Sequence, residues 1–288
     1  MTNPDVTSFF DTRTNNVSHI VADPETGACA IIDPLLDYDE ASGHTSTTSA
    51  DTIIQHINQA SLKVEWVIDT HIHADHISAA PYLKRQLGGI VASGEHVTKV
   101  QKIFGELFNA GPDFRLDGSQ FDHLFADGEQ YAIGNLRCTV LHTPGHTPAC
   151  TTHVIGDAAF VGDTLFMPDY GTARCDFPGG DARTLFRSIK RIFDLPLETR
   201  LFLNHDYLPE GRDTFCWQTT VAEQIRSNIH VHEGISEDAF VSMREERDAS
   251  LATPKLMIPS VQVNMRAGAF PEADSNGIRY LKIPLDIL

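Results

Sequence analysis

The sequence predicts an α/β fold in which two sheets lie together inside an outer cover of helices. Three observations support this prediction. Apolar runs typical of strands alternate with stretches of helical periodicity. The sequence carries no low-complexity tract and no flexible linker. Hydrophobic residues make up 41% of the 288 residues, which is enough for a sizeable core. We therefore expect a single domain over residues 1–288, with an irregular C-terminal extension from about residue 250.

The expected strands are apolar runs bounded by turn residues, and they lie at 17–23, 28–33, 64–69, 90–93, 131–133, 136–141, 151–155, 158–161 and 201–203. The expected helices have apolar residues three and four apart, and they lie at 50–60, 78–87, 95–104, 181–194, 215–228 and 237–248. In the first of these helices Ile53 and Ile57 share one face, and Ser78 is expected to cap the second. Loops are expected at 34–50 and 105–120.

The strongly acidic composition argues against two classes of partner. Lysine and arginine number 22, aspartate and glutamate number 39, and the formal net charge is −17. Nucleic acids and anionic membranes bind basic surfaces, so we expect neither as a partner. If the substrate is itself an anion, its site must carry a local arginine or lysine against the field of the whole protein.

The cysteines and the first residues favour a cytoplasmic location. The five cysteines are scattered and form no C-x-x-C pair, which suits a reducing compartment better than a disulfide framework. The start, Met1–Asp5, has neither the basic patch nor the apolar stretch of a secretory signal. No apolar run approaches the length of a transmembrane helix.

Residues 70–76, Thr-His-Ile-His-Ala-Asp-His, are the most informative segment of the chain. They place four metal-capable side chains within six residues directly after an apolar run: His71, His73, Asp75 and His76. Imidazole and carboxylate groups are ligands of first-row transition metals. Neither a strand nor a helix puts residues at these spacings on one side, so the four can converge only where the chain leaves regular structure. The segment therefore predicts a loop with an open metal site at the end of a strand.

Three later fragments also end apolar strands with a metal-capable side chain. They carry His146 in a Pro-Gly turn, Asp163 after a glycine, and His205 after Asn204. Each fragment alone is usually an ordinary turn. Together with the first loop they predict one site, because strand ends on one rim of a sheet are where the sites of α/β proteins are assembled.

The order H-x-H-x-D-H, G-H, G-D and H, from residue 71 to residue 205, resembles the metallo-β-lactamase superfamily. The resemblance extends to about residue 210, and it implies an αββα four-layer sandwich with a metal site on one rim. Flavodiiron proteins carry glutamate at the position of His73, and nucleases of the superfamily are usually more basic. The thiol-linked branches remain, which are persulfide dioxygenases and glyoxalase II-like thioesterases.

Three segments favour the persulfide dioxygenases. Gly171–Phe177 resembles their G-R-T-D-F segment, Asn204–Tyr207 resembles A-H-D-Y, and Val261–Gly268 resembles P-x-N-M-R-x-G. Glyoxalase II more often has G-H-E-Y, and its basic helical C-terminal domain has no clear counterpart in this sequence. Cys175 departs from the dioxygenase pattern, because threonine is usual at its position.

The resemblance to the dioxygenases implies one Fe(II) per chain, held by His71, His146 and Asp163. The reaction would oxidise glutathione persulfide with O2 to sulfite and glutathione. Further side chains are expected around the iron or at a second metal, and they are His73, Asp75, His76 and His205. The residues expected to bind the substrate are Arg174, as the local cation, Tyr207 and Arg266.

Two alternatives remain open. A dinuclear zinc hydroxyacylglutathione hydrolase of the glyoxalase II type would use the same side chains for two metals, whose bridging hydroxide attacks a thioester. A non-catalytic metal- or sulfur-binding module on the same fold is disfavoured by the complete ligand set. The family also suggests a homodimer.

Overall fold

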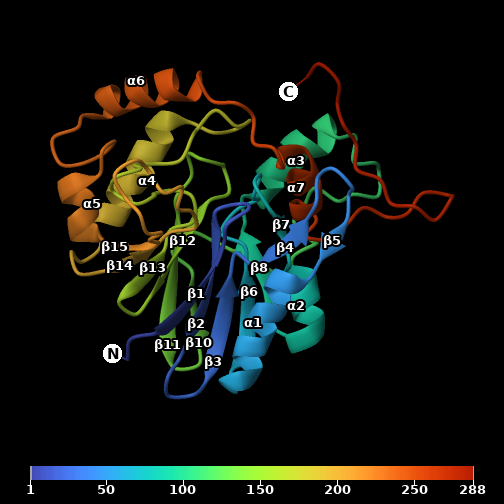
Figure 1. Cartoon of the computed structure of the whole chain (residues 1–288), viewed down its shortest axis with the longest axis horizontal. Coiled ribbons are helices and arrows are strands. Elements are labelled where there is room, and N and C mark those ends of the chain that lie inside the picture. Colours follow the sequence, from blue (N-terminus) through green and yellow to red (C-terminus); the bar gives the residue numbers. More distant parts are fainter. Residues whose placement is uncertain (1, 288) are drawn as a thin grey trace.

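Residues 2–287, the part of the chain described by the computed structural model, are arranged in four layers (Figure 1). Two six-stranded sheets face each other at the centre, and helices cover the outer face of each sheet. The expected αββα sandwich is therefore confirmed. Three hydrophobic clusters hold the layers together, one between the sheets and one beneath each helical cover.

The first sheet consists, in spatial order, of β1 (Asp5–Asp11), β2 (Asn16–Ala22), β3 (Ala28–Ile32), β6 (Lys63–Ile68), β8 (Ile90–Gly94) and β9 (His123–Phe125). β1, β2 and β3 are antiparallel neighbours, whereas β3, β6, β8 and β9 are parallel. Parallel neighbours need a crossover, and the crossovers contain α1 (Thr48–Gln59), α2 (Ala80–Leu87) and α3 (Val97–Leu107). These helices share one cover with α7 (Met257–Asn264).

The second sheet consists, in spatial order, of β10 (Gln130–Ile133), β11 (Leu136–His142), β12 (Thr151–Ile155), β13 (Ala158–Phe160), β14 (Arg200–Phe202) and β15 (Gln218–Thr220). Only β13 and β14 are parallel in this sheet, and α4 (Ala182–Phe193) forms their crossover. The cover on this side is completed by α5 (Val221–Ser227) and α6 (Glu237–Asp248). A small sheet of β5 (Thr45–Ser46), β4 (Leu35–Tyr38) and β7 (Ile77–Ser78) lies beside the first.

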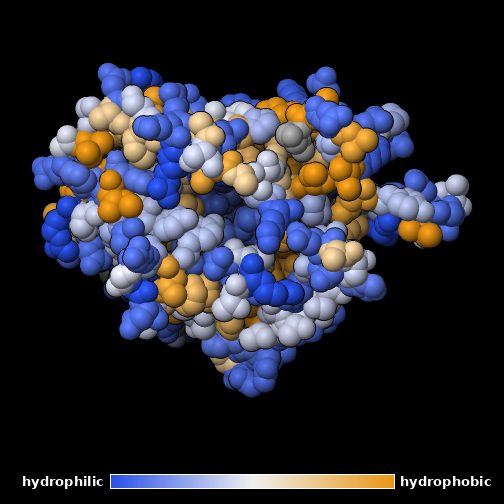
Figure 2. All heavy atoms as spheres, turned by 45° about the horizontal axis from the view of Figure 1, so that its top comes forward, coloured by the Kyte–Doolittle hydropathy of each residue, from blue (hydrophilic) through white to orange (hydrophobic). Residues whose placement is uncertain are grey.

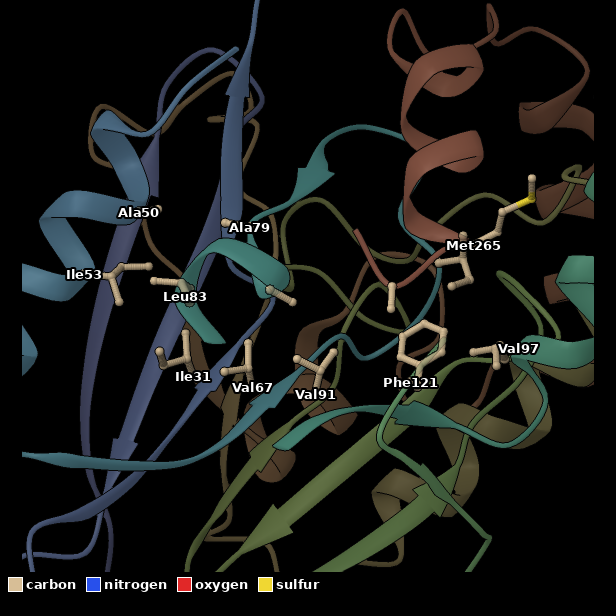
Figure 3. Packing of buried hydrophobic residues seen from close by; sticks show 14 of the residues in the cluster. Ile31, Ala50, Ile53, Val67, Ala79, Leu83, Val91, Val97, Phe121 and Met265 are labelled. Atoms are coloured by element: carbon tan, nitrogen blue, oxygen red, sulfur yellow. The ribbon is translucent and has the colours of Figure 1, made fainter. Parts of the chain in front are cut away.

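The parallel strands of the first sheet are buried on both faces. On β3, Ile31 packs toward the helical cover and its neighbour Ile32 packs toward the second sheet. Figure 3 shows Ile31 gathered with Val67 of β6, Ile53 of α1 and Leu83 of α2. Burial on both faces explains why these strands are continuous apolar runs in the sequence rather than alternating patterns.

The helices of both covers are short. None of those in residues 2–287 exceeds 12 residues, and α1, α4 and α6 reach that length. No helix in this part of the chain is long and apolar enough to cross a lipid bilayer. The helices instead stabilise the fold by burying one face against a sheet.

Four expected elements differ from those observed. The segment 34–50, expected to be a loop, contains β4, β5 and the first residues of α1. Ser78 belongs to β7 rather than acting as the helix cap, although its hydroxyl accepts a hydrogen bond of 3.2 Å from the amide of Ala80. The helix expected over 215–228 is shortened to α5, because residues 218–220 pair with β14 instead. The C-terminal extension, expected to be irregular, contains α7, which packs against the first sheet.

Gly145 brings the loop that carries His146 into direct contact with α4. Its φ of +137° lies in a region that residues with a side chain rarely adopt. A Cβ atom at this position would lie 2.3 Å from Cα and 2.4 Å from N of Leu185. The loop therefore packs directly on the helix backbone, and this contact fixes His146 relative to the second sheet.

We expect Gly145→Ala to lower the free energy of unfolding by about 3 kcal/mol, because steric overlap adds to backbone strain. Gly128→Ala is the matched control, since Gly128 has a φ of +75° and no atom within 4 Å of an added Cβ. It should cost only the strain, about 1–2 kcal/mol. Urea unfolding of both variants measures the difference, and equal losses would contradict the packing argument.

Candidate metal centre

The segments that carry the metal-capable residues meet at one rim of the two sheets. His71 follows β6, His146 follows β11, Asp163 follows β13 and His205 follows β14. Because β13 and β14 are parallel, their carboxyl ends deliver Asp163 and His205 to the same edge. Side chains as far apart in the sequence as Asp75 and His205, which are separated by 130 residues, are thereby brought within contact distance of one another.

His71, His146 and Asp163 form the first group. Nε2 of His71 and Nε2 of His146 each lie 3.6 Å from Oδ2 of Asp163. These separations exceed hydrogen-bond distance, and they suit two ligands of one ion, which lie about 3–4 Å apart when each is about 2.1 Å from the metal. All three side chains are buried. Two imidazoles and one carboxylate are a donor set suited to ferrous iron.

Asp163 also faces a second group, formed with Asp75, His76 and His205. Its Oδ1 lies 3.4 Å from Nε2 of His205. Oδ2 of Asp75 lies 3.2 Å from the same nitrogen and 3.1 Å from Nδ1 of His76. The two oxygens of Asp163 therefore face different groups, so this carboxylate could serve one metal or bridge two.

His73 lies between these groups and is paired with the carboxylate of Asp33, a residue that the sequence pattern does not identify. Its ring centroid is 4.0 Å from that of His71 and 4.2 Å from that of His76. Its Nε2 lies 2.7 Å from Oδ1 of Asp33. Burial lowers the pKa of His73, but the Asp33 carboxylate outweighs burial and raises that pKa to about 9. Burial raises the pKa of Asp33, but His73 more than offsets it and holds that pKa well below its usual range.

Five buried ligand atoms of these groups lack a hydrogen-bond partner within residues 2–287: His71 Nε2, His73 Nδ1, His76 Nε2, Asp163 Oδ1 and His205 Nε2. An unpaired buried polar atom costs about 1–3 kcal/mol. Metal ligation would satisfy such atoms, because imidazole nitrogens and carboxylate oxygens are the donors that iron and zinc take in proteins. The residues present therefore fit a metal site.

Asp33, directly after β3, connects the loops that carry these groups. Its carboxylate accepts hydrogen bonds from the amide of Thr70 at 2.7 Å and from the hydroxyl of Thr70 at 2.9 Å, and a third from the side-chain amide of Asn204. Oγ1 of Thr70 also lies 3.1 Å from Nδ1 of His71. The buried carboxylate of Asp33 thus orients three residues. They are His73, Thr70, whose hydroxyl lies beside His71, and Asn204, which precedes His205.

The first-group histidine His146 and the second-group histidine His205 are oriented by main-chain oxygens. Nδ1 of His146 donates to the carbonyl of Arg174 at 2.8 Å, and Nδ1 of His205 donates to the carbonyl of Asn15 at 3.0 Å. Contacts of this kind fix the ring and leave Nε2 for a metal.

Asn264, at the end of α7, ties the first loop to the C-terminal extension. Its Nδ2 donates to the carbonyls of His73 at 2.9 Å and His76 at 2.7 Å, and its Oδ1 accepts from the amide of Ser78 at 2.9 Å. Asn264 belongs to the C-terminal segment that resembles the dioxygenases, but the sequence alone assigns it no role. The structure shows that this distant residue closes the metal-capable loop.

A cavity of about 230 Å³ opens beside His146 and Asp163. The face of the molecule at the top of Figure 1 is hollowed near its middle (Figure 2). Four aromatic side chains line the cavity: Phe166, Tyr170, Phe177 and Tyr207. The ring of Tyr207 stacks on His205 at a centroid distance of 5.4 Å. The cavity thus offers a largely aromatic wall next to the first group of metal-capable atoms.

The two arginines that the sequence indicates for substrate binding lie in different cavities. Arg174 lines the cavity, but its guanidinium donates to both carboxylate oxygens of Asp176 at 2.6 Å and to the carbonyl of Ala252 at 2.7 Å. Arg266 lies elsewhere, 4.3 Å from the ring centroid of Phe114, in a different cavity. Tyr207 alone is placed as a free side chain against the metal-capable groups.

The chain is similar over most of its length to several known proteins. It is 56% identical to the "Probable metallo-hydrolase" of Burkholderia pseudomallei, over 98% of this chain and 99% of that protein. It is 53% identical to the "Beta-lactamase hydrolase-like protein" of Xylella fastidiosa, over 99% of this chain, but it spans only 65% of that protein. It is 49% identical to "Glyoxylase B2" of Dictyostelium discoideum, over 93% of this chain and 92% of that protein.

A more distant likeness extends to persulfide dioxygenases. The human mitochondrial persulfide dioxygenase ETHE1 is 30% identical over 90% of this chain and 87% of its own. The crystal structure of ETHE1 from Myxococcus xanthus matches with a TM-score of 0.72 at 29% identity, over 92% of this chain and 99% of that one. The model of the metallo-beta-lactamase superfamily matches residues 12–205, which is more than half of the chain and spans every metal-capable residue described above. The chain therefore belongs to the metallo-β-lactamase superfamily.

Proposed function

We propose that this protein is an Fe(II)-dependent persulfide dioxygenase. It would convert glutathione persulfide, O2 and water to glutathione and sulfite, so that the outer sulfur is oxidised and O2 is reduced. The observation that carries the proposal is the first group, two imidazoles and one carboxylate beside an aromatic cavity. Such a donor set leaves positions on iron free for two reactants. The likeness to ETHE1 over nearly its whole length adds support.

In this proposal His71, His146 and Asp163 hold one Fe(II) per chain. Bound there, ferrous iron would supply the electron transfer that overcomes the spin barrier between O2 and the persulfide sulfur. The chain's own contribution is to present the ligands in a fixed orientation. The hydroxyl of Thr70 lies behind His71, and the carbonyl of Arg174 lies behind His146.

The remaining metal-capable residues would surround this centre. His73 is held by Asp33, and His76 hydrogen-bonds to Asp75 at 3.1 Å. His205 borders both Asp75 and Asp163 and carries Tyr207 stacked on its ring. In this proposal these groups would orient water and substrate at the open side of the first group by hydrogen bonds.

The aromatic wall suits a sulfur-centred reaction. Phe166, Phe177 and Tyr207 bring apolar surface against the first group, and a polarizable sulfur atom packs well against aromatic rings. A wall of this kind limits the water that reaches the reacting atoms. The persulfide substrate would therefore enter with its outer sulfur toward His146 and Asp163 and its charged ends toward solvent.

A second candidate function has its own observation. Asp163 faces both groups with different oxygens, as a carboxylate that bridges two metals does. The Dictyostelium relative at 49% identity is named as a glyoxylase. The alternative is therefore a dinuclear zinc hydroxyacylglutathione hydrolase that uses the same seven side chains.

Metal content and oxygen uptake separate the two candidates. We expect the purified protein to contain about one iron per chain and to consume O2 with glutathione persulfide, because a 2-His-1-carboxylate site binds one ion. Metal analysis and an oxygen electrode measure both quantities, with S-lactoylglutathione as the control substrate. Two zinc ions per chain, with rapid hydrolysis of S-lactoylglutathione and no oxygen uptake by the iron-loaded protein, would replace the proposal with the hydrolase.

Substitution of single ligands tests which group binds the metal. We expect Asp163→Ala to lose its iron and more than about 100-fold in oxygen uptake, because it removes the only carboxylate of the first group. His76→Ala should keep most of its iron, because it alters only the second group. Iron content per folded chain is the measurement, with circular dichroism to verify folding. Equal loss of metal in the two variants would indicate a two-metal site.

Asp33→Asn tests the orientation of the loops. We expect iron affinity to fall by about 10–100-fold, because the substitution weakens a carboxylate that holds His73 and Thr70. Asp23→Asn is the matched control, since Asp23 is also fully buried and accepts three hydrogen bonds, but lies at the other end of the sheet. Competition with a chromophoric iron chelator gives the affinities. An equal fall in both variants would attribute the effect to stability alone.

A further inference from the structure

An anionic substrate meets an unfavourable field at this protein, and the cavity must counter it locally. The formal net charge of the chain is −17, which repels carboxylates at long range. Three arginines line the cavity beside His146 and Asp163, and they are Arg174, Arg244 and Arg247. An arginine that is not already paired with a carboxylate of the protein is the one best able to bind a substrate anion.

Two of the three arginines already form ion pairs with carboxylates of the protein. Arg174 forms a bidentate ion pair with Asp176, with both N···O distances at 2.6 Å. Arg244 is buried and pairs with Asp248 at 2.6 Å, and it also donates to the carbonyl of Thr172 at 3.1 Å. To bind a substrate carboxylate, either guanidinium would have to release a carboxylate of the protein.

Arg247 differs from both. It is exposed, and no carboxylate within residues 2–287 lies within ion-pair distance of its guanidinium. Its Cζ lies 6.0 Å from the ring centroid of Tyr170. The ring of Tyr170 stacks on Tyr207 at 4.9 Å, and Tyr207 stacks on His205 at 5.4 Å. A column of rings therefore runs from the metal-capable groups to a free cation at the cavity wall.

The helix that carries Arg247 is fixed against the cavity. Asp248, the next residue, pairs with Arg244 and accepts a hydrogen bond of 2.8 Å from the amide of Cys175. Arg244 in turn bonds the main chain at Thr172. These buried contacts join the last turn of α6 to the segment that forms the cavity wall, so the backbone at Arg247 is held in place while its side chain stays free.

We infer that Arg247 binds a carboxylate of the persulfide substrate and sets the preference of this cavity for persulfides that carry a carboxylate over those that carry none. The inference rests on the proposed function, and it assigns to Arg247 the cationic role that Arg174 cannot fill while paired with Asp176. A guanidinium can hold a carboxylate through two parallel hydrogen bonds, which gives both charge and orientation. With its carboxylate at Arg247, a substrate as long as glutathione can lie along the aromatic wall with its sulfur toward His146 and Asp163.

The test compares two substrates in the iron-loaded protein. Arg247→Met keeps the aliphatic part of the side chain and removes the charge. Arg247→Lys keeps the charge but cannot form two parallel hydrogen bonds to a carboxylate. Oxygen uptake is measured with glutathione persulfide and with the persulfide of 2-mercaptoethanol, which has no carboxylate. For Arg247→Met we expect the ratio of kcat/KM between the substrate with carboxylates and the substrate without them to fall on the order of tenfold, mostly through KM. Arg247→Lys should recover part of the ratio.

Arg85→Met is the matched control. Arg85 is an exposed arginine of α2 whose Cζ lies 5.9 Å from the ring centroid of Tyr82, almost the distance found for Arg247, and it does not line the cavity. It should leave the ratio unchanged. An unchanged ratio in Arg247→Met, or an equal fall in Arg85→Met, would overturn the inference.

Binding of reduced glutathione separates failure of the inference from failure of the proposed function. If the wild-type protein consumes no O2 with either persulfide, the dioxygenase proposal fails, but calorimetric titration with reduced glutathione still reports on Arg247. Binding that is weakened on the order of tenfold in Arg247→Met and not in Arg85→Met supports the inference. Equal binding in both variants, or no binding to the wild-type protein, refutes it.

Discussion

The metal-capable rim depends on one buried carboxylate, that of Asp33. A fully buried charge is tolerated only when it is paired and hydrogen-bonded, and Asp33 meets this condition with Thr70, His73 and Asn204. These partners lie on the loops after β6 and β14, which belong to different sheets. Satisfying one carboxylate therefore forces the two loops into a single arrangement. Asp33 itself has a φ of +50°, a strained conformation that the surrounding hydrogen bonds hold in place.

The same rim is unfavourable for stability when considered without a metal. The strands beneath it are buried on both faces and form a rigid support, whereas the loops above place five unpaired ligand atoms out of contact with water. Hydrophobic burial between the layers must offset this cost. Natural proteins accept such local conflicts mainly at functional sites, where a ligand resolves them. The concentration of unpaired atoms on one rim is therefore itself an argument that the site binds metal.

The sequence predicts the sheets and the strand ends better than it predicts the partners of the side chains released there. Apolar runs mark β3, β6 and β13 because both faces of these strands are buried. The structural role of Asp33 is not predicted, because Asp-Pro after a strand looks like an ordinary turn and its partner Asn204 is 171 residues away. Arg174 is identified as a cation near the site, but its pairing with Asp176 depends on a rotamer that sequence does not determine. α7 contains Pro259 and has little helical periodicity, so its pattern resembles a loop.

The two groups at the rim are not equally prepared for a metal. In the first group, each histidine has an oxygen behind it: Thr70 Oγ1 for His71 and the carbonyl of Arg174 for His146. In the second group, Nδ1 of His76 hydrogen-bonds to Asp75, which is itself a candidate ligand. Oδ2 of Asp75 also lies 3.2 Å from Nε2 of His205, so a metal at the second group must share an oxygen that two histidines already contact, whereas the first-group nitrogens lie 3.6 Å from Asp163. Because preorganisation raises affinity by removing costs of this kind, the first group should fill before the second. The occupancy of the second group would then depend on how readily Asp75 exchanges its contacts with His76 and His205 for a metal.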